Sequence, residues 1–148
     1  RIDNGAAEQP LLGNKDALVS ALGNLVANSL QAMPQNAVLV AQARINADGG
    51  IELRLRDNGP GIPAEAHAQI FEPFFTTRPG GTGLGLAVVQ ATVRAHRGSV
   101  HVEAPADGGS EFVVCLPTAL SVAELPGGEC LNYLSTAASV RHAVCGIN

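Results

Sequence analysis

The sequence predicts an α/β protein, and three of its patterns support that prediction. Apolar residues recur at helical spacing through residues 15–33, and a second helical pattern runs from Leu86 to Val93. Between them, residues 51–57 alternate apolar and charged side chains, which is typical of a strand with one buried face and one wet face. We therefore expect helices and strands in the same domain.

The composition predicts one globular domain. The chain has 148 residues, 46% of them apolar, and a formal net charge of −4. Without a basic stripe, nucleic acid is not expected as a partner. We see no bilayer-spanning apolar run and no signal peptide, so we expect no direct membrane contact. Cys115, Cys130 and Cys145 form no metal-binding pair and are interpreted as reduced thiols of a cytoplasmic protein.

The first elements are an edge strand within residues 1–12 and a long helix over residues 15–33. Asn14 is the expected N-cap of the helix, and Pro34 ends it. The residues predicted to form its buried stripe are Val19, Leu22, Val26, Leu30 and Met33.

Three amides, Asn24, Asn28 and Gln31, share the face of this helix opposite the apolar stripe. A solvated polar face is one interpretation. The other is a binding site, because small residues flank the amides and no charged residue lies among them. Amide oxygens are suitable ligands for Mg²⁺ beside phosphates.

Four further strands are predicted in two antiparallel pairs. Residues 37–46 and 51–57 are joined by the turn Asp48-Gly49-Gly50. Residues 99–104 and 111–116 are joined by a turn at residues 106–109.

The second strand ends in a segment with two possible roles. Asp57 and the glycines that follow it are typical of a simple turn. Alternatively, the Asp57 carboxylate accepts a hydrogen bond from an exocyclic amine, Gly61 lets a flat ring approach the backbone, and Ile62 packs on that ring. Spacing alone does not choose between the two.

Residues 64–70 are predicted to form a short helix, and residues 71–78 a lid. The lid contains three of the four phenylalanines, Phe71, Phe74 and Phe75, without helical or strand period. We interpret the rings as anchors of a loop that closes over a ligand, where Arg78 reaches a terminal phosphate.

A glycine-rich stretch, residues 80–86, precedes the second helix, predicted over residues 82–97. A helix that starts at such a turn directs unpaired N–H groups at one point, which suits a phosphate. A flexible turn is the alternative, since one glycine motif is a weak signal.

Residues 118–148 differ in character from the preceding chain. They show weak periodicity, and residues 131–144 are predicted to form a short helix. We find no chemistry in this tail and assign it no role.

Four separated blocks resemble the ATP-binding catalytic domain of two-component sensor histidine kinases. Asn24-x-x-x-Asn28 resembles the N box, and Asp57-x-Gly59-x-Gly61 the G1 box. Residues 71–75 resemble the F box, and Gly81-x-Gly83-x-Gly85 the G2 box. The lid sequence looks most like the nitrogen-regulation subgroup. The resemblance covers residues 11 to 117, and we expect residues 1–117 to form the catalytic domain.

The resemblance implies a Bergerat (GHKL) fold, a two-layer α/β sandwich with a mixed sheet covered by helices on one face. It implies that ATP and Mg²⁺ bind, and that the γ-phosphoryl group goes to a histidine on a separate dimerisation and phosphoacceptor domain. The implied catalytic residues are Asn24, Asn28 and Arg78, with Asn28 as the metal ligand. The expected ATP- or ADP-binding residues are Asn24, Asn28, Asp57, Gly59, Gly61, Ile62, Phe75, Thr77, Gly81, Thr82, Gly83, Leu84, Gly85, Leu86 and Ser110.

The resemblance has two departures and one gap. Gln31 stands where many members have lysine, and Ser110 where threonine is commoner. None of His67, His96, His101 and His142 has the sequence context of a phosphoacceptor, so we expect all four to be structural or exposed.

Two alternatives are an ATPase of the same superfamily and a non-catalytic nucleotide-binding module. The superfamily ATPases carry a water-activating glutamate where this chain has Asn24. An amide cannot accept the proton, so efficient hydrolysis is disfavoured. A downstream response regulator is the further partner that the resemblance implies.

Overall fold

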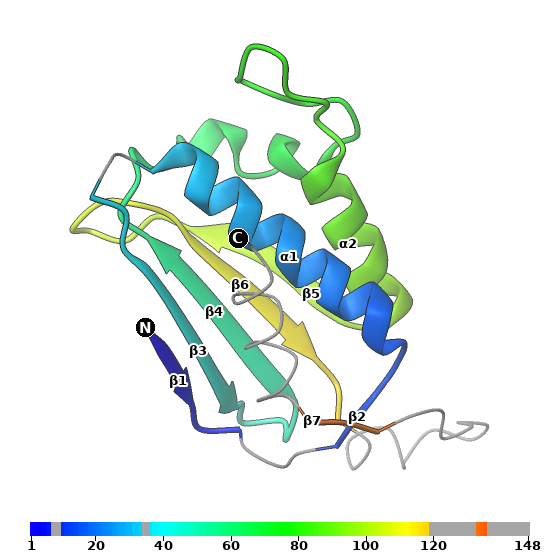
Figure 1. Ribbon diagram of the computed structural model, residues 1–148. Helices are drawn as coiled ribbons and strands as arrows, with labels where there is room; N and C mark the ends of the chain where they lie inside the picture. The colour runs from blue at the N-terminus through cyan, green and yellow to red at the C-terminus, as the bar shows by residue number, and fades with distance from the viewer. Residues whose placement is uncertain (7–9, 34–35, 119–132, 136–148) are drawn as a thin grey trace.

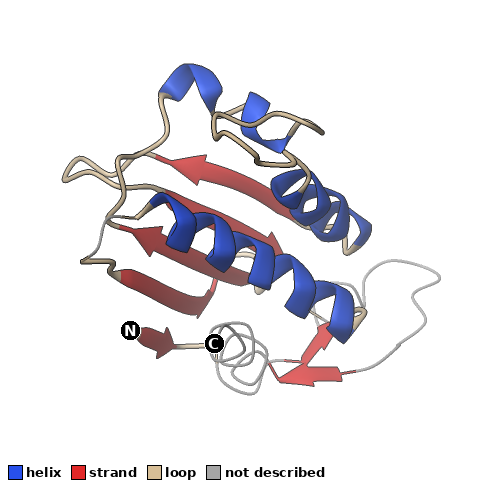
Figure 2. Cartoon of the chain, turned by 45° about the horizontal axis from the view of Figure 1, so that its top comes forward, coloured by secondary structure: helices blue, strands red, loops and turns tan. Residues whose placement is uncertain are grey.

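The computed structural model describes residues 1–6, 10–33, 36–118 and 133–135. A five-stranded sheet lies under two helices that cover one of its faces (Figures 1 and 2). The predicted α/β sandwich is therefore confirmed. The elements are β1 (Ile2–Asn4), β2 (Pro10–Leu12), α1 (Lys15–Ala32), β3 (Leu39–Ile45), β4 (Ile51–Asp57), η1 (Ala64–Ala66), η2 (Gln69–Phe71), α2 (Gly85–Ala95), β5 (Ser99–Glu103), β6 (Glu111–Leu116) and β7 (Tyr133–Ser135).

The sheet has the strand order β1-β3-β4-β6-β5 and is mixed, as expected. β1 runs parallel to β3, and the other pairs are antiparallel. The turn between β3 and β4 is held by Asn46, whose side-chain oxygen accepts hydrogen bonds from the N–H groups of Asp48 and Gly50. The two predicted strand pairs are confirmed.

Helix α1 begins at the predicted cap, because the Asn14 side chain accepts a 3.1 Å hydrogen bond from the Ala17 N–H. Its buried face differs from the predicted stripe. The buried residues are Leu18, Ala21, Leu25, Val26 and Ser29. Leu30 is 39% exposed, so the prediction that it faces the core was wrong. The face of α1 that packs on the sheet is therefore rotated about the helix axis from the face predicted by the large apolar residues.

The core lies between the helices and the sheet. Val89 and Val93 of α2 and Phe112 of β6 are almost fully buried there. The opposite face of the sheet carries ion pairs centred on Arg54, whose guanidinium contacts Glu52, Glu103 and Glu111. The hydrogen bond from Arg54, with a further one from Arg44, holds the pKa of the Glu52 carboxyl below its usual value.

The edge strand predicted within residues 1–12 is confirmed as β1, and the same segment holds a second strand, β2, that pairs with β7 in a separate sheet. Three other predicted elements need correction. Residues 64–70 contain two 3₁₀ turns, η1 and η2, in place of one helix. The helix predicted over 82–97 starts only at Gly85, because Gly83 has a positive φ of 65°. Residues 133–135 form strand β7, and the rest of the helix predicted over 131–144 lies outside the described residues.

No helix in the described part of the chain combines the length and apolar character needed to cross a membrane. Cys115, the one cysteine in that part, is a free thiol. Cys130 and Cys145 lie outside it.

Candidate functional site

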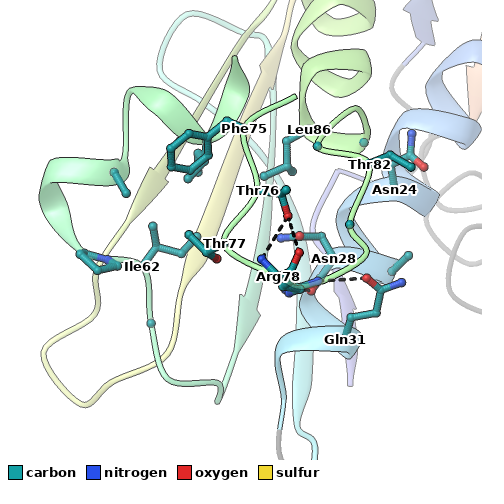
Figure 3. Close-up of a pocket in the computed structure, with 18 residues that line it drawn as sticks. Asn24, Asn28, Gln31, Ile62, Phe75, Thr76, Thr77, Arg78, Thr82 and Leu86 are labelled. Atoms are coloured by element: carbon teal, nitrogen blue, oxygen red, sulfur yellow. Dashed lines mark hydrogen bonds between the residues drawn. The ribbon is translucent and has the colours of Figure 1, made fainter. Parts of the chain in front are cut away.

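A cavity of about 320 Å³ opens between α1, the loop after β4, the lid and the start of α2 (Figure 3). Twelve of the predicted site residues line it: Asn24, Asn28, Gly61, Ile62, Phe75, Thr77, Arg78, Gly81, Thr82, Gly83, Gly85 and Leu86. Asp57, Gly59, Leu84 and Ser110 do not line it. The remaining lining residues are Ala27, Gln31, Pro63, Ala66, Ile70 and Thr76.

The wall formed by α1 presents amides to the cavity. Asn24, Asn28 and Gln31 all line it, since residues at i, i+4 and i+7 share one helix face. The side chains of Asn24 and Asn28 form no hydrogen bond with another described residue. Their oxygens are therefore available to a ligand or a metal ion.

Asp57 lies at the end of β4, outside the cavity lining, and is 5% exposed. Its Oδ1 accepts hydrogen bonds from the N–H groups of Gly59, at 2.9 Å, and Ser110, at 3.1 Å. Its Oδ2 accepts none from the described residues. The two donors fix the carboxylate and leave one oxygen for an incoming donor.

The loop after Asp57 is shaped by close backbone packing. Gly61 has a φ of 83°, and a Cβ there would lie 3.1 Å from the Gly109 carbonyl oxygen. Ile62, which lines the cavity, is held through its carbonyl oxygen, 2.9 Å from His67 Nε2. This role of His67 could not be predicted from the sequence, because its partner is a backbone carbonyl oxygen and every residue has one.

The lid and the glycine stretch pack against each other. The Phe74 N–H donates a 2.9 Å hydrogen bond to the Gly83 carbonyl oxygen. A Cβ at Gly83 would lie 2.7 Å from the Phe74 Cα, so no other residue fits without a shift.

The three phenylalanines of the lid differ in environment. Phe71 is buried and Phe75 lines the cavity, but Phe74 is 74% exposed. The prediction that all three rings anchor the lid was therefore wrong for Phe74. Its positive φ of 69° turns the side chain outward while its backbone stays bound to Gly83.

Arg78 links the lid to α1 through hydrogen bonds. Its Nη1 donates to Gln31 Oε1 and its Nη2 to the Asn28 carbonyl oxygen, both at 3.0 Å (Figure 3). Among the residues that line the cavity, Arg78 is the one with an ionisable side chain. The cavity is thus polar, weakly cationic and without a carboxylate on its lining.

The histidines are structural or exposed where the structure describes them. His67 and His96 are bonded to backbone atoms. His101, whose side chain is 53% exposed, lies 3.2 Å from Glu103. His142 lies outside the described residues.

Comparison with known proteins decides the family. The model of the family described as histidine kinase-, DNA gyrase B- and HSP90-like ATPase matches residues 13–120. This chain belongs to that family. The sensor histidine kinase CpxA of Escherichia coli K12 is 42% identical over 114 residues, which cover 73% of this chain and 24% of CpxA. The sensor histidine kinase ZraS of the same strain is 40% identical, over 69% of this chain and 22% of ZraS.

Solved structures of the family share the fold. The mycobacterial sensor histidine kinase MprB superposes with a TM-score of 0.72 at 30% identity, covering 80% of this chain and 81% of that one. Full-length ShkA, solved in complex with AMPPNP, gives a TM-score of 0.66 at 28% identity, covering 80% of this chain and 26% of ShkA. The chain spans about a quarter of the length of the curated relatives it matches. The nitrogen-regulation subgroup stays a prediction.

The residues of the cavity fit a nucleotide with a metal ion. Asn28 offers a free hard oxygen ligand, and the backbone of Gly81, Gly83 and Gly85 lines the cavity where α2 begins, as a bound anion would require. Asp57 does not line the cavity, but its Oδ2 accepts no hydrogen bond from the described residues and could accept one from an amine.

Proposed function

We propose that this chain binds ATP with Mg²⁺ and donates the γ-phosphoryl group to a histidine on a separate dimerisation and phosphoacceptor domain. The observation that carries the proposal is the cavity itself, in which the amides of α1, the glycine stretch and Arg78 converge. The AMPPNP complex of the family relative ShkA supports the choice of nucleotide.

Each group has a role that follows from its chemistry. Asn28 ligates Mg²⁺, with Asn24 one turn away, and the metal ion offsets phosphate charge. Backbone N–H groups at Gly83 and Gly85 bind the phosphates. Those of Gly81 and Leu84 join them by exchanging their present acceptors, the Arg78 carbonyl oxygen and Thr82 Oγ1, for phosphate oxygens, and Arg78 binds the terminal phosphate. Asp57 accepts the adenine amine, beside Gly61 and Ile62. Gly59, Phe75, Thr77, Thr82, Leu86 and Ser110 complete the proposed nucleotide site.

Phosphotransfer is favoured over hydrolysis because the cavity lacks a general base. No aspartate, glutamate or histidine is among the described residues that line it. The chain can position a phosphoryl group and stabilise its charge, but it has no side chain there to take a proton from water. The base would come with the acceptor histidine's own domain.

Three exposed apolar residues lie within the glycine stretch or are bonded to it through their backbone, and we refer to them as the apolar patch, which suits that domain. Phe74, Leu84 and Val88 are 74%, 40% and 45% exposed. Phe74 is bonded to Gly83, and Val88 to Leu84, so the patch borders the end of the cavity where the phosphates bind. We propose that this patch contacts the phosphoacceptor domain. A response regulator then receives the phosphoryl group from that domain.

We further propose that residues 1–117 form the catalytic domain, which works in the cytoplasm where ATP is available. Residues 118–148 receive no role.

Calorimetry and phosphotransfer test the proposal. We expect saturable, Mg²⁺-dependent binding of ATP and ADP in the micromolar range, roughly 8 kcal/mol of binding free energy. With a phosphoacceptor domain of CpxA supplied in trans, label from γ-labelled ATP should appear in an acid-labile, base-stable bond. Absence of nucleotide binding would remove the proposal. Rapid phosphate release by the chain alone would favour the ATPase alternative.

A further inference from the structure

The cavity has a single ionisable side chain on its lining, and that side chain is held in place before any nucleotide binds. Arg78 comes from the lid, yet its guanidinium reaches α1, where Gln31 Oε1 and the Asn28 carbonyl oxygen each accept a 3.0 Å hydrogen bond (Figure 3). The backbone N–H of Arg78 is bonded to Thr76 Oγ1 at 3.1 Å. Both ends of the arginine are thus fixed.

Of the two acceptors on α1, only the one on Gln31 can be removed by a substitution. The Asn28 acceptor is a backbone carbonyl, present whatever residue occupies the position. The Gln31 acceptor is a side chain, so the position of Arg78 depends on residue type there.

The guanidinium has donors to spare after these contacts. It carries five N–H donors in a planar fork, and the structure engages two of its nitrogens with α1. The remaining donors are free to bind an anion in the cavity. A triphosphate binds there under the proposed function, and Mg²⁺ offsets only part of its charge.

We propose that Gln31 is a positioning residue that presents Arg78 to the terminal phosphate of ATP. This inference rests on the proposed function. A neutral amide is suited to the task, because it fixes the guanidinium without cancelling its charge. A glutamate would pair with Arg78 and consume that charge, and a lysine would repel it.

Gln31 then acts on the γ-phosphate selectively and only through Arg78. ADP lacks the terminal phosphate, so its affinity should depend little on either residue. This separates a positioning role from a general effect on the cavity, which would change ATP and ADP binding together.

The first test is a double-mutant cycle read by calorimetry with Mg²⁺. Gln31→Met keeps the side-chain length and removes the acceptor, and Arg78→Ala removes the cation. We expect Gln31→Met to weaken ATP binding about fivefold to tenfold and to change ADP binding less than twofold. In the Arg78→Ala background, Gln31→Met should have no further effect on ATP.

Three results would overturn the inference: no change in ATP affinity in Gln31→Met, equal losses for ATP and ADP, or a full effect in the Arg78→Ala background. Failure of the proposed function is distinguishable, because the unmodified chain would then bind neither nucleotide.

The second test uses the chain without nucleotide. Hydrogen exchange of the lid amides, and of the neighbouring Gly81 N–H that donates to the Arg78 carbonyl oxygen, should accelerate in Gln31→Met. Gln42→Met is the matched control, since Gln42 is exposed on β3 away from the cavity. Unchanged lid exchange in Gln31→Met would contradict a positioning role.

Discussion

His96 Nε2 accepts a 2.9 Å hydrogen bond from the backbone N–H of Asn14, although 82 positions separate the two residues. The other ring nitrogen, Nδ1, lies 2.7 Å from the Thr92 carbonyl oxygen. The ring therefore joins the C-terminal end of α2 to the cap of α1, at the end of the helices opposite the lid.

The His96 contact predicts opposite effects for one substitution at two glycines. A Cβ at Gly13 would run into the His96 ring, whereas a Cβ at Gly23, inside α1, would meet nothing within 4 Å. We expect Gly13→Ala to lower the free energy of unfolding by about 1–2 kcal/mol and Gly23→Ala to raise it by about 0.5–1 kcal/mol. Urea denaturation measures both. A stabilising Gly13→Ala would contradict the contact.

Asp57→Asn should change nucleotide preference with little effect on folding. An asparagine can keep its oxygen toward the Gly59 and Ser110 donors, which places its NH₂ group where Oδ2 now lies. A donor then faces the adenine amine. We expect ATP affinity to fall about tenfold or more.

Inosine triphosphate provides the matched ligand for that experiment, because it replaces the amine by a carbonyl. Calorimetry should show that the unmodified chain prefers ATP and that Asp57→Asn loses this preference. An unchanged preference would remove Asp57 as the adenine anchor.

Much of the fold could be predicted from the sequence, where local pattern and tertiary packing agree. β4 was located correctly because its alternation matches burial on the sheet, and α1 starts at Asn14 because that side chain caps it. The cavity-lining residues in the N-box, G1 and G2 motifs could be named because glycines and amides carry their chemistry locally.

The remainder depends on contacts that no local pattern encodes. The bond between Gln31 and Arg78 requires the lid to lie against α1, 47 positions earlier in the chain. The outward direction of Phe74 follows from a positive φ, which its residue type does not predict. β7 pairs with β2 near the other end of the chain, and that partner overrides the weak helical pattern of its own segment.

Acid should destabilise the fold through the ion pairs of the open sheet face. The pKa of Glu52 is lowered in the folded chain from 4.5, chiefly by the hydrogen bond from Arg54. The unfolded chain then binds the proton more readily, so this stabilisation is present above about pH 4.5 and is lost as the pH falls through the folded pKa. Urea denaturation between pH 7 and pH 3 should show the decline. Arg54→Met should make it shallower and cost roughly 1–2 kcal/mol at pH 7.

Ser29→Ala should leave stability unchanged or raise it by up to about 1 kcal/mol. The Ser29 hydroxyl is fully buried on α1 and has no hydrogen-bond partner among the described residues. Burying this hydroxyl without a partner costs free energy on folding, and the alanine variant no longer bears that cost. Ser20→Ala, on the exposed side of the same helix, measures the helix-propensity gain alone. A clear loss of stability specific to Ser29→Ala would show that the hydroxyl has a partner after all.

Gly83→Ala should disable nucleotide binding while the core stays folded. Its φ is 65° and its Cβ would meet the Phe74 backbone, so the lid and the glycine stretch must separate. Gly80→Ala is the control, because Gly80 has a similar φ of 77° but open space around its Cβ. Both variants bear the backbone strain of about 1 kcal/mol, and only Gly83→Ala adds the clash. We expect ATP affinity to fall tenfold or more in Gly83→Ala, and the loss of affinity in Gly80→Ala to be several times smaller. The thermal midpoint of unfolding should stay close to that of the unmodified chain in both variants. Equal losses of affinity would mean that strain alone, and not the contact with Phe74, governs the phosphate end of the cavity.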